Sequence, residues 1–78
     1  MTNAFVLINC DEDHEENIVS NLRKIKNVEY VQKTIGAYDL VIKVNAENAS
    51  KLKETIKNKI KEIQDIRHAL TLVEPVRE

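Results

Sequence analysis

Residues 34–40 read Thr34-Ile35-Gly36-Ala37-Tyr38-Asp39-Leu40 and hold the only glycine of the 78-residue chain. Strand-like runs flank this stretch on both sides, which places Gly36 in a turn between two strands. Glycine adopts left-handed backbone conformations at no steric cost, so one glycine used here indicates a turn of special geometry or a close approach by another group. Tyr38 and Asp39 follow with a hydroxyl-bearing ring and a carboxylate. We therefore treat this corner as the candidate site and the rest of the chain as its scaffold.

Four segments around this turn are predicted to be strands. Residues 28–34 and 38–44 lie on either side of it and, being close in sequence, should pair antiparallel. Residues 4–10 form another predicted strand, and its positions 4–8 are apolar without alternation, so both faces of that strand should be covered. Residues 66–73 form the last predicted strand, which Pro75 should end because proline cannot donate to a ladder.

Two helices are predicted between these strands. The first follows the acidic run 11–16, with Asp13 at a capping position and apolar residues at steps of three and four. Asn45 is the predicted N-cap of the second helix. The apolar stripe of the second helix is Ala49, Leu52, Ile56, Ile60 and Ile63.

The resulting order is β-α-β-β-α-β. Two βαβ halves with right-handed crossovers predict an α+β fold, a ferredoxin-like sandwich in which a four-stranded antiparallel sheet carries both helices on one face. The opposite face is then bare in one copy, yet the strand 4–10 is apolar on both sides. We therefore expect a homodimer formed through the sheet.

Composition narrows the class of protein. A chain of 78 residues makes a single domain, 1–78, with a marginal core. Cys10 is the only cysteine, which excludes an internal disulfide and fits a reducing interior. The N-terminus lacks a basic leader and the apolar run 4–8 is too short to span a bilayer, so we expect a cytoplasmic protein without membrane contact. The net charge of -1 and three aromatic residues argue against nucleic-acid binding.

Other polar groups favour structural roles. The acidic run 11–16 suits a helix N-terminus, and the lysines of the second helix suit a solvated face. His14 and His68 lack the partners of a zinc site, and for His68 we favour a structural role over contact with a ligand or a neighbouring subunit. The acids that follow Cys10 disfavour the thiolate that redox chemistry needs. We expect no metal, no cofactor and no catalysis.

The chemistry of the turn itself leaves two alternatives open. Asp39 can pair with the ammonium group of an amino acid while backbone amides of the turn hold its carboxylate. Alternatively, Asp39 caps backbone groups of a simple turn and Tyr38 packs in a core. The residues alone do not favour either alternative.

The stretch Gly36-Ala37-Tyr38-Asp39-Leu40-Val41, set between two strands of this β-α pattern, resembles the effector-binding RAM domain of the Lrp/AsnC regulators. The resemblance covers almost the whole chain, from residue 4 to residue 73. The chain departs from the family pattern at three places: Ile35 stands where threonine is frequent, Pro-Gly is missing from both helix-to-strand connections, and His68-Ala69 replaces a Ser/Thr-Thr pair.

The resemblance implies a sheet-to-sheet dimer, in some members a tetramer of dimers, with an amino acid or related small molecule bound between dimers. The ligand-binding residues we expect are Thr34, Ile35, Gly36, Ala37, Tyr38, Asp39, His68 and Thr71. We expect no helix-turn-helix in this chain and no direct DNA binding. It would instead act by protein contacts, for example with full-length Lrp/AsnC regulators.

Two other classes remain as alternatives. A small dimeric α+β-barrel enzyme would need polar groups in a pocket between sheet and helices. An ACT-like regulatory or structural module would share the strand order and differ in how its copies assemble.

Overall fold

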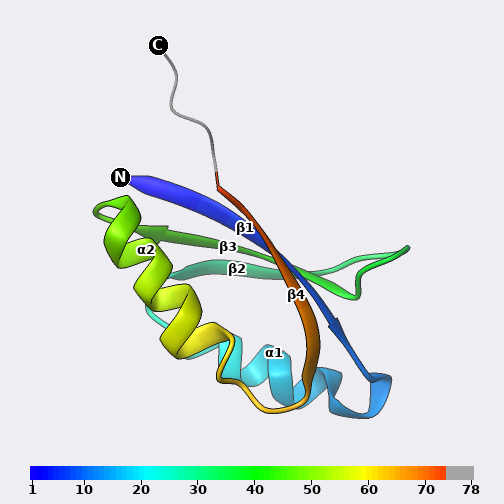
Figure 1. Ribbon diagram of the computed structural model, residues 1–78. Coiled ribbons are helices and arrows are strands. Elements are labelled where there is room, and N and C mark those ends of the chain that lie inside the picture. Colours follow the sequence, from blue (N-terminus) through cyan, green and yellow to red (C-terminus); the bar gives the residue numbers. More distant parts are fainter. Residues whose placement is uncertain (74–78) are drawn as a thin grey trace.

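The computed structural model describes residues 1–73 as one sheet with its helices on a single face (Figure 1). In chain order the elements are β1 (Thr2–Cys10), the 3-10 turn η1 (Glu12–His14), α1 (Glu15–Arg23), β2 (Val28–Lys33), β3 (Leu40–Ala46), α2 (Ala49–Thr55), the π-helical turn η2 (Ile56–Ile60) and β4 (Ile66–Val73). Pro75, the predicted stop of the last strand, lies outside the described residues. None of the helices within residues 1–73 has the length and apolar character needed to cross a membrane.

The sheet has the order β2-β3-β1-β4, and all three neighbouring pairs are antiparallel. This confirms the predicted ferredoxin-like βαββαβ fold with both helices on one face. Strand β1 is central, with β3 on one side and β4 on the other. Strands β2 and β4 form the two edges.

The core lies between the sheet and the helices. Val6 pairs with Ile42 and Ile8 with Leu40, and all four side chains are fully buried. The helices contribute their own buried stripe of Ile18, Leu22, Leu52, Ile56 and Ile60. One face of β1 and one face of β3 therefore form the sheet side of the core.

The other side of the sheet, which we call the open face, carries apolar side chains without a helix to cover them. Phe5 pairs with Leu72 and Leu7 with Leu70, while Leu7 also pairs with Val41 on its other side. Leu70 is 40% exposed and Leu72 51% exposed. As expected, β1 is apolar on both faces, and one of these faces remains partly open to water in a single copy.

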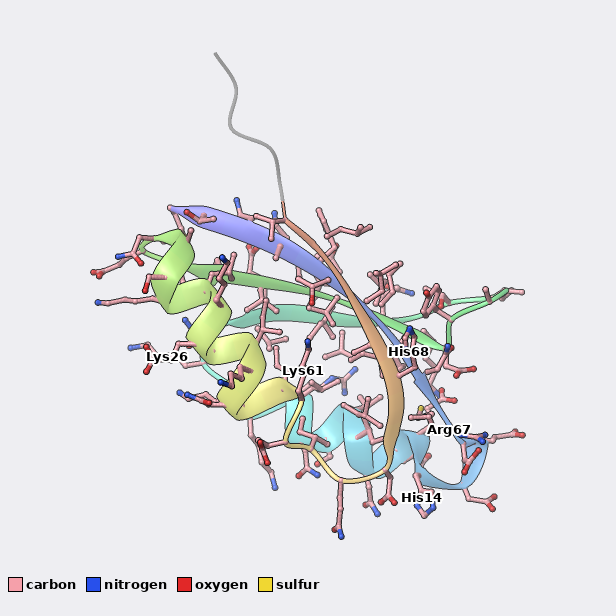
Figure 2. The ribbon with its side chains drawn as sticks, viewed as in Figure 1. His14, Lys26, Lys61, Arg67 and His68 are labelled. Carbon is pink, nitrogen blue, oxygen red and sulfur yellow. The ribbon has the colours of Figure 1, made fainter. Side chains whose placement is uncertain are left out.

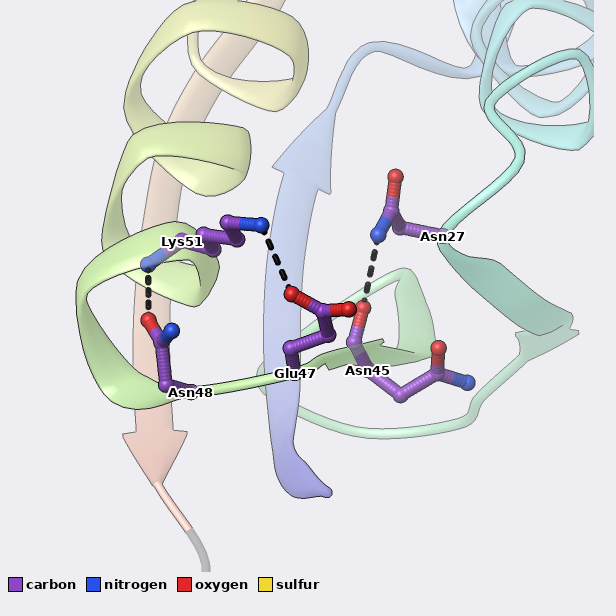
Figure 3. A network of polar contacts seen from close by, with 5 residues as sticks. All are labelled: Asn27, Asn45, Glu47, Asn48 and Lys51. Carbon is purple, nitrogen blue, oxygen red and sulfur yellow. Dashed lines mark hydrogen bonds and ion pairs between the residues drawn. The ribbon is translucent and has the colours of Figure 1, made fainter.

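Both helix starts differ from the predictions. The first begins with a 3-10 turn, and Asp13 makes no capping hydrogen bond there. Asn45 was also the wrong N-cap, because β3 continues to Ala46 and the N–H of Asn45 donates to the carbonyl of Asn27 (2.9 Å). Asn48 caps the helix instead, accepting from the N–H of Lys51 at 2.9 Å (Figure 3).

The π-helical turn explains how Leu52, Ile56 and Ile60 of the predicted apolar stripe stay buried, whereas Ala49 is exposed and Ile63 lies beyond the helix. Leu52, Ile56 and Ile60 repeat every four residues, and in an α-helix each such step rotates the side chain by about 40°. The wider turn at residues 56–60, closed by the N–H of Lys61 donating to Ile56 (2.9 Å), takes up an extra residue and offsets this drift. All three side chains consequently face the sheet.

The connection from η2 to β4 turns on Asp65, whose φ of 75° is in the left-handed region. Aspartate tolerates this region better than most residues other than glycine. Its carboxylate lies 3.6 Å from Nδ1 of His14, and Arg67 pairs with Asp11 at 2.8 Å. These exposed contacts link the second connection to the start of the first helix.

Candidate functional site

Residues 34–39 form a loop that closes on itself at its base. The N–H of Thr34 donates to the carbonyl of Asp39 (2.9 Å), and the Thr34 hydroxyl donates to the carbonyl of Tyr38 (2.6 Å). These bonds hold Tyr38 and Asp39 within the loop. They explain why β3 begins at Leu40, two residues later than predicted.

The tip of the loop projects away from the sheet (Figure 1). Gly36 has a φ of 124°, where a side chain is strained, although a Cβ added there would meet nothing within 4 Å. Glycine is therefore required by the backbone and not by a close neighbour within the copy. Ile35, next to it, is fully exposed. An exposed isoleucine at a projecting tip suits contact with another molecule.

Asp39 ties the loop to the end of β1. Its N–H donates to the carbonyl of Ile8 (2.9 Å), and its Oδ2 accepts from the N–H of Cys10 (3.0 Å). One of the two alternatives that the sequence left open, Asp39 as a backbone cap, is thus present. A carboxylate has about four acceptor positions, so this bond leaves capacity for a further donor.

Tyr38 lies beside His68, although the two residues come from distant parts of the chain. Their rings stack with centroids 6.5 Å apart and an interplanar angle of 23°. His68 is on β4 opposite Asn9 of β1, so Tyr38 reaches across the end of the central strand. Tyr38, Asp39 and His68 therefore gather around that end of β1. Figure 2 shows where His68 lies on β4.

Thr71 does not join this group. It pairs with Val6, whose side chain is buried beneath the helices, so Thr71 faces the helix layer. It lines a groove beside α2, and its hydroxyl is buried without a hydrogen-bond partner among the described residues. Seven of the eight expected residues thus lie near one end of the sheet. Thr71 lies apart from them, on the face that the helices cover.

The Cys10 thiol is not set up for redox chemistry. Burial raises its pKa, and the carboxylates of Asp39, Glu15 and Asp11 raise it further. The thiol is therefore held in its protonated, less nucleophilic form. Cys10 contributes its backbone N–H to the site, where this group donates a hydrogen bond to the Asp39 carboxylate. No sequence signal pointed to that contact between residues 29 positions apart.

A four-stranded antiparallel sheet with two helices on one face and an exposed loop at residues 34–39 places the chain in the class of ferredoxin-like domains. Its identity within that class follows from comparison with known proteins. The chain belongs to the Lrp/AsnC ligand binding domain family, whose model matches residues 3–74.

Two curated relatives come from Pyrococcus. The chain is 32% identical over 75 residues to the uncharacterised HTH-type transcriptional regulator PF0250 of Pyrococcus furiosus, and 31% identical to PH1916 of Pyrococcus horikoshii. Each match covers 92% of this chain and 50% of the relative. The chain therefore spans about half the length of these regulators.

Solved structures agree on the fold. FFRP-DM1 is 25% identical with a TM-score of 0.91, over 96% of this chain and 100% of that one. AsnC of E. coli is 23% identical with a TM-score of 0.86, over 99% of this chain and 54% of AsnC. The regulator NMB0573 of Neisseria meningitidis, solved as an L-Met complex, is 13% identical with a TM-score of 0.85, over 96% of this chain and 50% of that one.

Proposed function

We propose that this domain is a non-enzymatic sensor of an amino acid or a related small molecule, bound at the loop 34–39. The observation that carries the proposal is the gathering of Tyr38, Asp39 and His68 at one end of the open face. Membership of a regulator ligand-binding family supports it, and so does the L-Met complex of the Neisseria regulator. The cytoplasm is the expected compartment, given a single unpaired cysteine.

The groups at this corner complement a zwitterion. The free acceptor capacity of Asp39 suits an ammonium group, and the backbone N–H groups around Gly36 suit a carboxylate. The stacked rings of Tyr38 and His68 supply a flat wall for a side chain. In one copy the loop tip is open to solvent, so we propose that a second subunit closes the site.

Homodimerisation is the second part of the proposal. The open face carries Phe5, Leu7, Leu70 and Leu72 without a covering layer, and burying such apolar area is the main driving force for association. The exposed Ile35 suits a further contact between dimers, in a tetramer of dimers. Full-length Lrp/AsnC regulators, which share this domain, are the proposed protein partners.

An enzymatic function is the weaker alternative. A barrel enzyme of this topology would need polar groups between the sheet and the helices. Within residues 1–73 the buried residues of that layer are all apolar, and Thr71 adds a single buried hydroxyl. The apolar contacts between the sheet and the helices are those of a packed core and support the sensor proposal over an enzymatic function.

Calorimetric titration with each of the twenty amino acids tests the proposed function. We expect saturable heat for one or a few of them, and a species larger than a monomer in light scattering. Absence of heat from all twenty, together with a strictly monomeric protein, would overturn the proposal.

Substitution of Asp39 should weaken amino-acid binding by about 1–3 kcal/mol, because one charged partner is left unpaired. Asp39→Asn keeps an acceptor for the Cys10 N–H and removes only the charge, so it should fold normally and bind poorly. Asp39→Ala should also lower the melting temperature, since it leaves the N–H of Cys10 without its hydrogen-bond partner. Titration and thermal melts of both variants check this.

Glu54→Gln is the matched control, because it removes an exposed carboxylate on α2, away from the loop. It should bind like the wild type. Wild-type affinity in Asp39→Asn would restrict Asp39 to positioning the loop.

A further inference from the structure

We infer that the groove between the second helix and β4 is a docking site for an extended acidic peptide of a partner protein, which adds to the outer edge of β4. This surface lies on the helix side of the sheet. It is separate from the loop 34–39 and from the open face. The inference is therefore independent of the proposed ligand site and of the proposed dimer.

The floor of the groove is apolar and can contact the apolar side chains of a bound peptide. The groove has a volume of about 410 Å³ and runs along the helix from Ala49 to Lys61. Leu52, Ile56 and Val73 form its apolar lining. The Thr71 hydroxyl, which has no hydrogen-bond partner among residues 1–73, also faces this groove. A buried hydroxyl without a partner is costly and would gain from a polar group brought by an occupant.

A row of positive charge lines the same groove. Lys53, Lys57 and Lys61 line it at four-residue spacing, and among residues 1–73 no acidic residue joins them in its lining. Figure 2 shows Lys61 at the end of η2, on the side of the helix toward β4. None of the three takes part in an ion pair formed within residues 1–73, whereas Lys51 pairs with Glu47 at 2.7 Å. Three lysines without carboxylate partners beside an apolar floor complement an acidic, partly apolar segment.

The spacing of the lysines favours an extended chain. Residues four apart on an α-helix rise by about 6 Å, and the wider π-helical turn at residues 56–60 shortens this rise between Lys57 and Lys61. Alternate residues of a β-strand, which point to the same side, lie about 6.6 Å apart. Carboxylates at alternate positions of a strand lying along the groove would therefore meet successive lysines. A small molecule with one anionic group would use only one of them.

Strand β4 provides the hydrogen-bonding edge for such a segment. It is the end strand of the sheet and pairs with β1 on one side only, within the part of the chain described (Figure 1). An edge strand presents a row of unpaired backbone N–H and C=O groups, and peptides bind such edges by adding a strand. The groove and the β4 edge lie together, so one extended peptide can use both.

The opposite edge of the sheet lacks this combination. The hollow beside α1, on the side of β2, is lined by charges of both signs, among them Glu16, Arg23 and Lys33. Lys33 already pairs with Glu15 at 3.3 Å. The groove beside β4 differs from this hollow in that no acidic residue within residues 1–73 lines it.

The test uses fluorescence anisotropy of labelled peptides of about eight residues added to the intact protein. One peptide alternates glutamate and valine, a second has lysine in place of glutamate, and a third has the composition of the first in scrambled order. We expect saturable binding of the first peptide only, weakened by added salt. Binding of the lysine peptide, or equal binding of the scrambled one, would overturn the inference.

Two matched variants locate the contact. Lys57→Glu reverses a charge in the groove, and Lys59→Glu makes the same change on the same turn but outside the groove lining. We expect Lys57→Glu to weaken peptide binding by about tenfold or more and Lys59→Glu by less than about twofold. Equal effects would indicate diffuse charge attraction and contradict a defined groove.

Hydrogen exchange of the β4 amides supplies the backbone evidence. Peptide binding should slow exchange at the outward-facing amides of β4, because strand addition gives them partners. Unchanged exchange with the peptide bound would exclude the edge. Should Lys57→Glu change the oligomeric state seen in light scattering, the groove would be covered by a second copy instead, which also overturns the inference.

Discussion

Replacing Leu70 with aspartate is expected to convert the protein from a dimer to a monomer. Leu70 lies in the middle of the open face opposite Leu7 and is 40% exposed in one copy, so water solvates the new carboxylate in the monomer. In the proposed dimer the charge would be buried without a partner, at a cost of about 3–5 kcal/mol. The dimer dissociation constant should then rise by roughly two orders of magnitude or more. Sedimentation equilibrium at several protein concentrations measures this shift.

Ser50→Asp provides the matched control, because it adds the same charge on the exposed side of α2. Its dissociation constant should equal that of the wild type. Leu70→Asp should also keep its circular dichroism spectrum, since the open face contributes little to the core of a single copy. A Leu70→Asp protein that dimerises as tightly as the wild type would exclude the open face as the interface.

Truncating Ile42 to alanine should cause a large loss of stability. Ile42 is fully buried on β3, paired with Val6 on one side and Val31 on the other. Removing its side chain leaves a cavity between sheet and helices, which costs about 2–5 kcal/mol. Domains of this kind have only about 5–15 kcal/mol in total, so Ile42→Ala should be close to unfolding. Urea denaturation followed by circular dichroism gives the difference.

Ile35→Ala removes the same atoms from a fully exposed side chain at the loop tip. Its free energy of unfolding should lie within about 0.5 kcal/mol of the wild type. All three proteins must be compared at one concentration, because dimerisation contributes to apparent stability. Equal losses at both positions would contradict the location of the core.

The fold could be predicted from the sequence because apolar residues recur with the period of a strand or of a helix. Alternation in residues 40–44 and the four-residue steps from Leu52 to Ile60 each bury one face, and the structure buries those same faces. Errors arose where a local propensity competed with long-range pairing. Asn45 has the propensity of a helix cap, yet backbone pairing keeps it in β3, and Asn48 caps the helix.

The site was less predictable, since its contacts join distant residues. Nothing local indicates that the Asp39 carboxylate binds the N–H of Cys10 or that Tyr38 stacks on His68. One feature of the site could be predicted from the sequence, namely that His68 and Thr71 lie apart. His68 and Thr71 are three residues apart in a strand, so a period of two places them on opposite faces. The fold alone also fits an ACT-like module, and the family match is what separates the two.

The course of β1 has a consequence for any segment joined covalently to this domain. Thr2 starts the strand and Ala4 pairs with Val73, so residues 2 and 73 lie at the same end of the sheet. Asp39 contacts Ile8 and Cys10 at the other end, about 26 Å away along the strand. A conformational signal from an occupied loop would thus have to travel the length of the sheet, along β1 or β3, or pass through a second subunit. The loop and a segment attached next to residue 2 or residue 73 are separated by the length of the sheet.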